Sequence, residues 1–223
     1  MHTVIGEILP LALVVTVSPI NIIAAILLLF SPRPIPNASA YLAGFVLGVG
    51  GALALVVVVA DAIGLTPGSD RSTVASVVLV VVGAALVAGG VLELRKRPGP
   101  DEEVALPGWM AGIDAFSTFR SFRVGVLIGA ANPKNLAVAV ASAVTVANAG
   151  LPAAQQVVAC AVYVLLAVVG VATPLVVAVA LGDRSQSVLE SWRTWLVRNN
   201  AAVMAVIFLV FGVVLIGKGI AGA

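Results

Sequence analysis

The sequence predicts an all-α polytopic membrane protein with six transmembrane helices. Of its 223 residues, 61% are hydrophobic and only 10% are charged. No soluble fold could bury so much apolar surface, so the lipid bilayer must act as its solvent. Six apolar stretches have about the 20 residues that cross a hydrocarbon core of roughly 30 Å. They cover residues 5–30, 39–61, 73–94, 123–147, 153–181 and 201–221.

The first and fourth predicted helices each contain a proline among polar residues. Their sequences there are Ser18-Pro19-Ile20-Asn21 and Asn132-Pro133-Lys134-Asn135. A proline inside a helix removes a backbone donor and clashes with the preceding turn. We therefore expect both helices to be broken at the proline. The freed carbonyls should face a polar interior, because lipid tails cannot donate hydrogen bonds to them.

The two proline motifs suggest that the chain contains a repeat, and the remaining predicted helices carry packing signals and a second repeated pattern. Small residues spaced four apart, such as Gly44 and Gly48 in the second helix, allow close helix approach. The third helix has a glycine pattern that recurs in the sixth, with Gly83 matching Gly212. Two repeats of three helices would be inserted with opposite topology, because three is odd. We expect transmembrane repeats at residues 1–94 and 123–223, joined by a basic loop at 95–122.

The distribution of basic residues predicts the orientation of the chain. One set of connections contains Arg33, Arg95, Lys96, Arg97, Arg120, Arg123, Arg184, Arg193 and Arg198, and the other set contains only Arg71 and Lys218. Loops rich in Lys and Arg stay in the cytoplasm. The first, third and fifth connections should therefore be cytoplasmic, with both termini outside a bacterial plasma membrane.

Two of the cytoplasmic connections are expected to form amphipathic helices at the membrane interface. In the loop at 95–122, the residues at helical spacing are Trp109, Ile113, Phe116 and either Phe119 or Arg120. In the connection before the sixth helix they are Val188, Leu189, Trp192, Trp195 and Leu196. Such segments usually anchor a protein at the lipid interface. A docking surface for a partner or a lipid headgroup is the alternative.

Lys134 is predicted to lie near the middle of the membrane. Counting 1.5 Å per residue from the start of the fourth helix places it roughly 16 Å deep, where a lysine costs about 2.5–3.5 kcal/mol. We therefore expect a central substrate site suited to a carboxylate, phosphate or sulfate. Its expected residues are Ser18, Pro19, Asn21, Asn132, Pro133, Lys134 and Asn135. The alternative is that the prolines only kink their helices and a buried partner neutralises Lys134.

Other polar residues in the predicted helices have secondary roles. Glu7 and Asp61, near the outer ends of the first and second helices, are the candidate proton carriers if transport is coupled to protons. Thr173 precedes Pro174 in the fifth helix. We expect Thr173 to bond freed backbone groups near the site without touching the substrate.

Several functional classes are not expected from this composition. The only histidine is His2 and the only cysteine is Cys160, so no metal, no cofactor and no paired-thiol redox centre is predicted. The sequence has no protease motif, so no catalytic residue is assigned and no enzyme is expected. The net charge of +2 has no long basic run, which argues against nucleic acid as a partner.

The pattern resembles the lysine exporter (LysE) superfamily over nearly the whole chain. The shared features are six hydrophobic segments, a proline motif in the first, Asn132-Pro133-Lys134 in the fourth and a long basic loop. The residue sequences of both proline motifs are most similar to those of the GAP branch, the glycopeptidolipid- and sulfolipid-addressing proteins of actinobacteria. Amino-acid exporters of the superfamily usually have Pro-Gly-Pro in the first motif. No glycine follows Pro19 here, which argues against amino-acid export. The resemblance implies a role in carrying cell-envelope glycolipids across the plasma membrane.

Two functions are therefore open at the level of sequence. The first is an exporter of LysE-like type that moves an envelope lipid or glycolipid, or a small anionic or zwitterionic metabolite, by alternating access. The second is an accessory membrane protein that transports nothing and assembles or localises a lipid-export machine. The expected partners are membrane lipids and the substrate, with a homo-oligomer or a larger lipid-export complex left open.

Overall fold

The computed structural model of this protein describes residues 1–62, 71–95, 108–110 and 112–221. Every regular element within these ranges is helical, which confirms the predicted all-α class. The α-helices are α1 (His2–Thr16), α2 (Pro19–Leu29), α3 (Pro34–Ala62), α4 (Arg71–Arg95), α5 (Thr118–Ala131), α6 (Pro133–Asn148), α7 (Ala153–Ala167), α8 (Val169–Leu181) and α9 (Ser185–Ala221). The short 3-10 turns are η1 (Gly108–Met110), η2 (Ile113–Ala115) and η3 (Gly182–Arg184).

The helices are long and apolar enough for a membrane protein. Three stretches of the described chain pass this test alone: Pro34–Ala60, Ser76–Arg95 and Val169–Ala221. The number rises to five if α1–α2 and α5–α6, which are bent, each form one span. The predicted fifth span is interrupted at Val168, between α7 and α8. The number of six spans stays a prediction.

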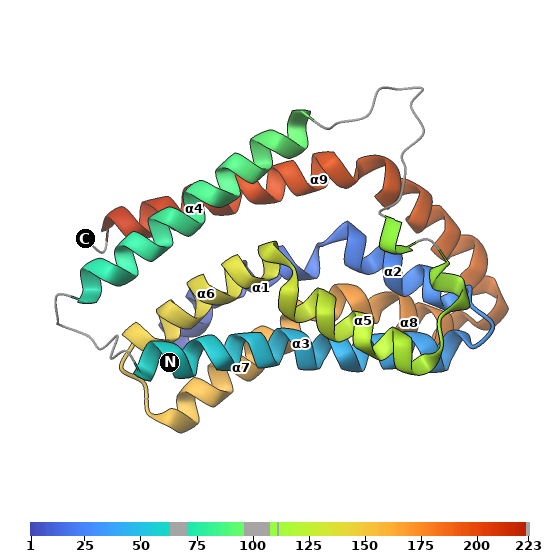
Figure 1. Cartoon of the computed structure of the whole chain (residues 1–223), viewed down its shortest axis with the longest axis horizontal. Helices are drawn as coiled ribbons and strands as arrows, with labels where there is room; N and C mark the ends of the chain where they lie inside the picture. Colours follow the sequence, from blue (N-terminus) through green and yellow to red (C-terminus); the bar gives the residue numbers. More distant parts are fainter. Residues whose placement is uncertain (63–70, 96–107, 111, 222–223) are drawn as a thin grey trace.

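The helices form layers along the long axis of the molecule (Figure 1). α4 and α9 lie side by side as one layer, which contacts α6, α2 and α1. On the other side, α3 packs against α5 and α6, α7 packs against α1, and α8 packs against α2. The bent pairs α1–α2 and α5–α6 therefore lie in the middle of the bundle. Both termini lie at the same end, at the left of Figure 1.

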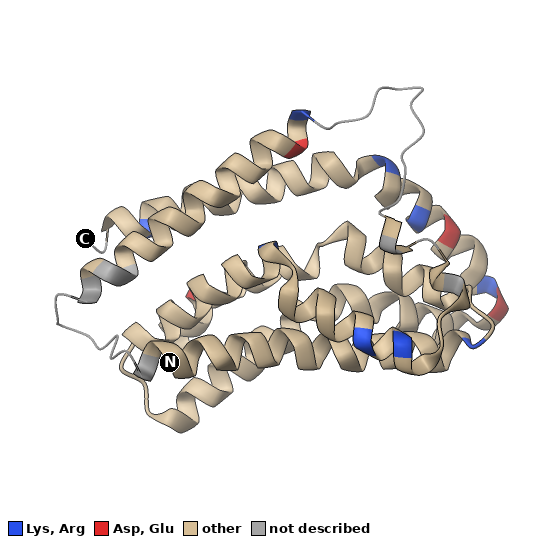
Figure 2. Cartoon of the chain, in the orientation of Figure 1, with Lys and Arg blue, Asp and Glu red and all other residues tan. Residues whose placement is uncertain are grey.

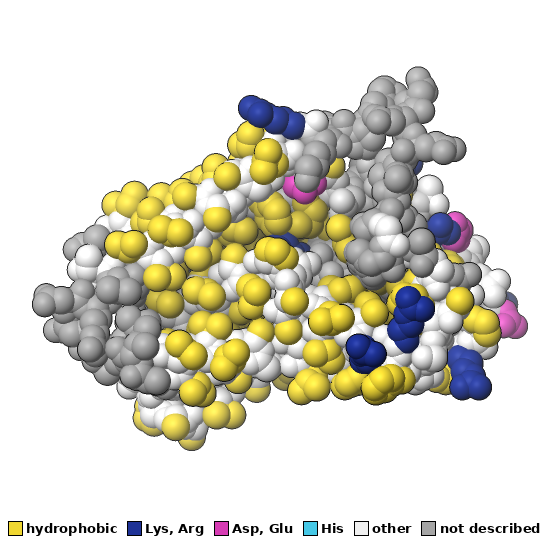
Figure 3. All heavy atoms as spheres, in the orientation of Figure 1, with side chains coloured by type: hydrophobic (Ala, Val, Ile, Leu, Met, Phe, Trp, Pro, Cys, Tyr) yellow, Lys and Arg dark blue, Asp and Glu magenta, His cyan; other side chains and the backbone are white. Residues whose placement is uncertain are grey.

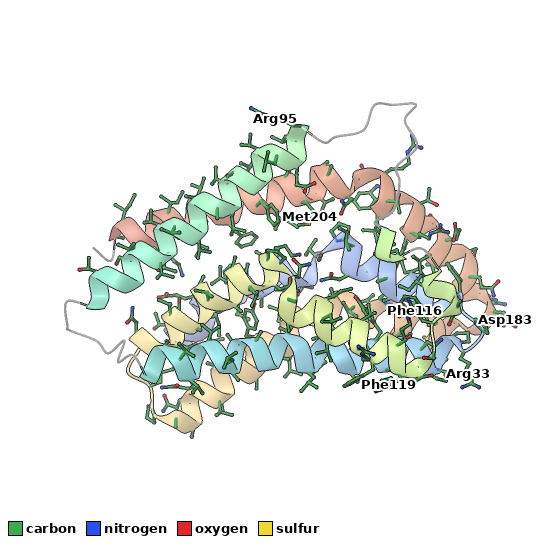
Figure 4. The ribbon with its side chains drawn as sticks, in the orientation of Figure 1. Arg33, Arg95, Phe116, Phe119, Asp183 and Met204 are labelled. Carbon is green, nitrogen blue, oxygen red and sulfur yellow. The ribbon has the colours of Figure 1, made fainter. Side chains whose placement is uncertain are left out.

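Most of the charged residues gather at the end of the molecule opposite the termini (Figure 2). Arg33 and Asp183 lie at this end in Figure 4. Hydrophobic side chains cover much of the surface between the two ends (Figure 3), as a bilayer requires. This basic end is the one that the sequence predicts to be cytoplasmic. The orientation itself stays a prediction.

The segment before α5 differs from the short interfacial helix that the sequence predicts. It contains the 3-10 turns η1 and η2, and Gly112 between them has a φ of 72°, a left-handed conformation that ends a right-handed helix. Ile113 and Phe116 are buried, so the segment packs into the protein instead of lying on lipid. The side chain of Trp109 and residues 96–107 lie outside the described residues.

The second predicted interfacial helix is the first part of α9. This helix runs without interruption from Ser185 to Ala221, so the predicted interfacial segment and the sixth span are continuous. Leu189 is buried, whereas Trp195 is 57% exposed. Farther along α9, the buried Met204 lies between this helix and the layer beneath it (Figure 4). The apolar face of the first part thus packs against protein, and only part of it faces outward.

α4 and α9 contact each other through glycines in reciprocal pairs. A Cβ at Gly83 would lie 2.7 Å from the Gly212 carbonyl oxygen, and a Cβ at Gly212 would lie 2.8 Å from the Gly83 oxygen. Two further contacts keep the same offset of 129 residues, namely Gly90 with the Ala205 oxygen and Gly219 with the Ser76 oxygen. Each close approach of these two backbones therefore occurs twice, once in each direction.

Candidate functional site

Two helices are broken at the prolines that the sequence singled out. The helix axis bends by 51° between α1 and α2, and we call this point the first break. It bends by 55° between α5 and α6, and we call this point the second break. Pro19 and Pro133 each begin the second helix of the pair, where a missing N–H costs nothing. Since neither proline can donate to the preceding helix, each break leaves carbonyls that need other partners.

At the first break, a side chain from the second half of the chain bonds a freed carbonyl. The N–H of Ser18 donates to the Val15 carbonyl over 3.3 Å, one residue short of the Val14 carbonyl that it would reach in a regular α-helix. Lys134 Nζ, from the first turn of α6, donates to the Val14 carbonyl oxygen over 3.1 Å. Lys134 thus links the second half of the chain to the first break.

The ammonium of Lys134 is deeply buried and has no anionic partner in the described part of the chain. The residue is only 7% exposed, and the ion pairs among the described residues join Glu190 to Arg193 and Glu7 to Lys218. A buried charge without a counter-ion is costly. Within these residues, a carboxylate that neutralises Lys134 for packing alone is not found.

At the second break, the polar side chains bond groups of their own helix pair. Asn135 Nδ2 donates to the Ile128 carbonyl of α5 over 3.0 Å. Asn132 Oδ1 accepts from the N–H of Lys134 over 3.1 Å, which is the usual geometry of an N-cap residue. The second break is thus closed locally by its own amides.

Asn21 occupies the same place in the first motif as Asn135 in the second, but it makes no such bond. It is completely buried, and neither its side-chain nitrogen nor its side-chain oxygen has a hydrogen-bond partner within the described residues. The buried Tyr41 hydroxyl donates to the backbone oxygen of Asn21 over 3.4 Å. A buried amide without partners is rare in native proteins and needs an explanation.

A third break, between α7 and α8, packs directly on the first. The Thr16 hydroxyl at the end of α1 donates to the Leu166 carbonyl near the end of α7. Gly170 in α8 lies so close to α1 that a Cβ there would overlap the Thr16 carbonyl oxygen. The sequence predicts a kink of this span at Pro174, whereas the structure interrupts it six residues earlier, at Val168.

An apolar pocket of about 500 Å³ lies beside the first break. Its wall includes Thr16, Ile22, Gly170, Thr173, Trp192 and Trp195. Thr173 donates to the Val169 carbonyl over 2.7 Å, the ordinary bond of a helical threonine to the carbonyl four residues back, whereas the carbonyl that Pro174 leaves free is that of Gly170. The predicted role of Thr173 stays a prediction. The two tryptophans, which the sequence predicts as interface anchors, are exposed and also line this pocket, whose apolar wall suits a hydrocarbon chain.

A smaller pocket of about 370 Å³ lies beside the second break. Its wall includes Ile20 of α2, Leu127 and Ile128 of α5, and both Asn132 and Pro133. Of the seven predicted substrate residues, Asn132 and Pro133 therefore line a pocket. The other five, Ser18, Pro19, Asn21, Lys134 and Asn135, are buried at the two breaks.

The predicted proton carriers are placed differently by the structure. Glu7 forms an ion pair with Lys218, with 3.3 Å between Oε2 and Nζ, and their side chains are 44% and 32% exposed. The pair lies in a pocket of about 460 Å³ that also includes Thr145 and Asn148. The side chain of Asp61 lies outside the described residues. Proton coupling through Glu7 or Asp61 stays a prediction.

Two contributors to the breaks were missed at the level of sequence. One is the Val14 carbonyl, a backbone group that has no residue signature. The other is Tyr41, which could have been found because the chain has two tyrosines, one in each half. Tyr163, in α7, is also fully buried. The two tyrosines are 122 positions apart, between the offset of 114 for the prolines and the offset of 129 for the glycines.

A family model matches almost the whole chain. It describes Sap, the sulfolipid-1-addressing protein, and it covers residues 8–221. A search of curated proteins and a search of solved structures gave no significant match. The matched range includes the first and second breaks, Lys134 and the apolar pocket. The chain belongs to the sulfolipid-1-addressing protein family.

Proposed function

We propose that this protein is an exporter of LysE-like type, without enzymatic activity, that moves an anionic envelope lipid across the bacterial plasma membrane. The observation that carries the proposal is the Lys134 ammonium, which lies buried between two broken helices and bonds the Val14 carbonyl. Sulfate and phosphate are strong acceptors for such a group. The description of the family names a sulfolipid, a lipid that carries an anionic sulfur-containing headgroup.

The apolar pocket favours a lipid over a small metabolite. Thr16 in its wall lies two residues from Val14, so the pocket and the Lys134 ammonium adjoin the same break. An amphiphile can place its headgroup at Lys134 and an acyl chain beside Trp192 and Trp195. A small anionic metabolite would use the cation but would leave the pocket without a role.

The mechanism that we infer is alternating access by two inverted repeats, at residues 1–94 and 123–223. Three helix pairs support this relationship by their matched residues: Pro19 with Pro133, Tyr41 with Tyr163, and Gly83 with Gly212. The reciprocal glycine contacts of α4 and α9 are what a two-fold axis between these helices would produce. The second and fifth predicted helices make a matching pair of close contacts, of Gly48 with the Ala130 backbone and of Gly170 with the Thr16 backbone. These contacts correspond under the same repeat, because Gly48 and Gly170 have the offset of the two tyrosines, and Thr16 and Ala130 have the offset of the two prolines.

The test uses two lipids that differ only in a sulfate group. Purified protein is placed in vesicles that contain either sulfatide or galactosylceramide, and the fraction of each lipid in the outer leaflet is followed over time. The wild type should speed the movement of sulfatide well above that of galactosylceramide. Lys134→Ala should abolish this difference, because it removes the cation that binds the sulfate.

The matched control is Lys218→Ala. Lys218 is the other lysine of the described helices, but it pairs with Glu7 near the terminal end, so its loss should leave sulfatide movement intact. If wild-type vesicles move neither lipid, and cells with Lys134→Ala keep their normal envelope, the transport proposal is wrong. The accessory role in a lipid-export machine would then be the better explanation.

A further inference from the structure

The Val14 carbonyl at the first break has two candidate donors and uses one of them. Lys134 Nζ bonds it over 3.1 Å. Asn21, seven residues after Val14, is fully buried and its amide has no partner among the described residues. A buried amide should not stay unpartnered in every state of the protein, because it loses its bonds to water and gains nothing in return.

The second break shows which bond Asn21 can form. There Asn135, also seven residues after its carbonyl partner, donates to the Ile128 oxygen over 3.0 Å. The two breaks bend by similar angles, 51° and 55°, and both place proline five residues after that carbonyl. Asn21 is therefore in the right register to donate to the Val14 oxygen.

The difference between the breaks has a simple cause in the sequence. Lys134 follows Pro133 directly, and the residue that follows Pro19 directly is Ile20. The side chain of isoleucine cannot donate a hydrogen bond, so the side chain of Ile20 does not compete with Asn135 for the Ile128 carbonyl. At the first break Lys134 bonds the Val14 carbonyl, and the Asn21 amide does not.

The geometry points to an exchange at the first break, in which the Asn21 amide takes the Val14 carbonyl when the Lys134 ammonium turns to an anionic headgroup. This inference rests on the proposed function, because it assumes that Lys134 binds an anion. Without Asn21, anion binding would leave the Val14 carbonyl buried and unbonded, which would weaken affinity by about 5- to 150-fold. Asn21 is thus a positioning residue that acts through Lys134, without itself contacting the headgroup.

The first experiment tests the exchange without any substrate. Asn21→Ala is measured in the wild type and in Lys134→Met, with Lys134→Ala as a second background, by thermal unfolding in detergent. With Lys134 present, Asn21→Ala should shift the melting temperature by less than about 2 °C, since the amide makes no bond. With Lys134 removed, Asn21→Ala should lower it by roughly 2–10 °C more, because the Val14 carbonyl then loses its last donor.

The matched control is Asn135→Ala, which removes an amide that is already bonded. It should lower the melting temperature by the same amount in the wild type and in both Lys134 variants. Equal effects of Asn21→Ala with and without Lys134 would overturn the exchange. This result would not touch the proposed function, because no lipid is present.

The second experiment measures the affinity for sulfatide in detergent. Asn21→Ala should bind sulfatide about 5- to 150-fold more weakly than the wild type, while its melting temperature without lipid stays unchanged. Unchanged affinity would overturn the exchange even if sulfatide binds at Lys134. If sulfatide binds neither protein, the proposed substrate class is wrong and the exchange on anion binding is overturned with it, even where the thermal experiment shows that Asn21 takes the Val14 carbonyl once Lys134 is removed.

Discussion

The two broken helices share a motif but satisfy their backbones in different ways. The second break uses Asn135 from its own helix pair to bond the Ile128 carbonyl. The first break bonds the Val14 carbonyl with Lys134 from the other half of the chain and leaves Asn21 without a partner. The carbonyl at the second break is therefore bonded from within its own helix pair, although the Asn135 side-chain oxygen has no partner among the described residues. The first break instead depends on a charged group that a ligand can attract.

The largest effect is expected where α8 packs on the first break. Gly170→Ala would place a Cβ on the Thr16 carbonyl oxygen, and neither backbone can move without disturbing the break. Such overpacking costs about 3 kcal/mol or more. We expect most of the variant to be lost as aggregate, which size-exclusion chromatography after extraction from membranes would measure.

Gly51→Ala is the control for this prediction. No atom lies within 4 Å of a Cβ added at Gly51 in α3, and alanine favours a helix by about 0.5–1 kcal/mol over glycine. Gly51→Ala should therefore yield at least as much folded protein as the wild type. Normal yield of Gly170→Ala would show that α8 does not hold the first break in place.

The next effect separates the two asparagines of the motif. Asn135→Ala removes the donor of the Ile128 carbonyl and should lower the free energy of unfolding by about 1–3 kcal/mol. Asn21→Ala loses the packing of a buried side chain but also removes the cost of a buried amide without partners. Because these two effects oppose each other, it should change the free energy of unfolding by less than about 0.5 kcal/mol. Denaturant unfolding of both variants in the same detergent measures the difference. Equal losses would mean that the two breaks are closed alike.

The sequence predicts the first and second breaks well because proline has an unambiguous physical effect on a helix. It also predicts that Lys134 is buried, since a lysine at that depth cannot reach water. It does not distinguish Asn21 from Asn135, because their motifs share the proline and the asparagine and the outcome depends on how α6 packs against α1. Only the tertiary structure shows which carbonyl Lys134 reaches.

Other parts of the fold lie beyond what the pattern of residues can indicate. The interruption between α7 and α8 lies at Val168, six residues before Pro174, and Gly170 beside it packs against Thr16. The turns before α5 depend on Gly112 in a left-handed conformation, whereas apolar spacing alone favours a helix there. Hydrophobic periodicity cannot tell a lipid-facing surface from a buried one in a membrane protein, because both are apolar.

The smallest effect compares the caps of the two helices that begin with proline. Asn132 caps α6 by accepting from the N–H of Lys134, so Asn132→Ala should cost about 0.5–2 kcal/mol. Ser18 occupies the same position before α2 but makes no side-chain cap bond, so Ser18→Ala should cost only a few tenths of a kcal/mol, about the limit of detection. Denaturant unfolding of the two variants measures both costs. A larger loss for Ser18→Ala would mean that the first break, too, is held by its own polar side chains, and the dependence of this break on Lys134 would then be weaker than the hydrogen bonds indicate.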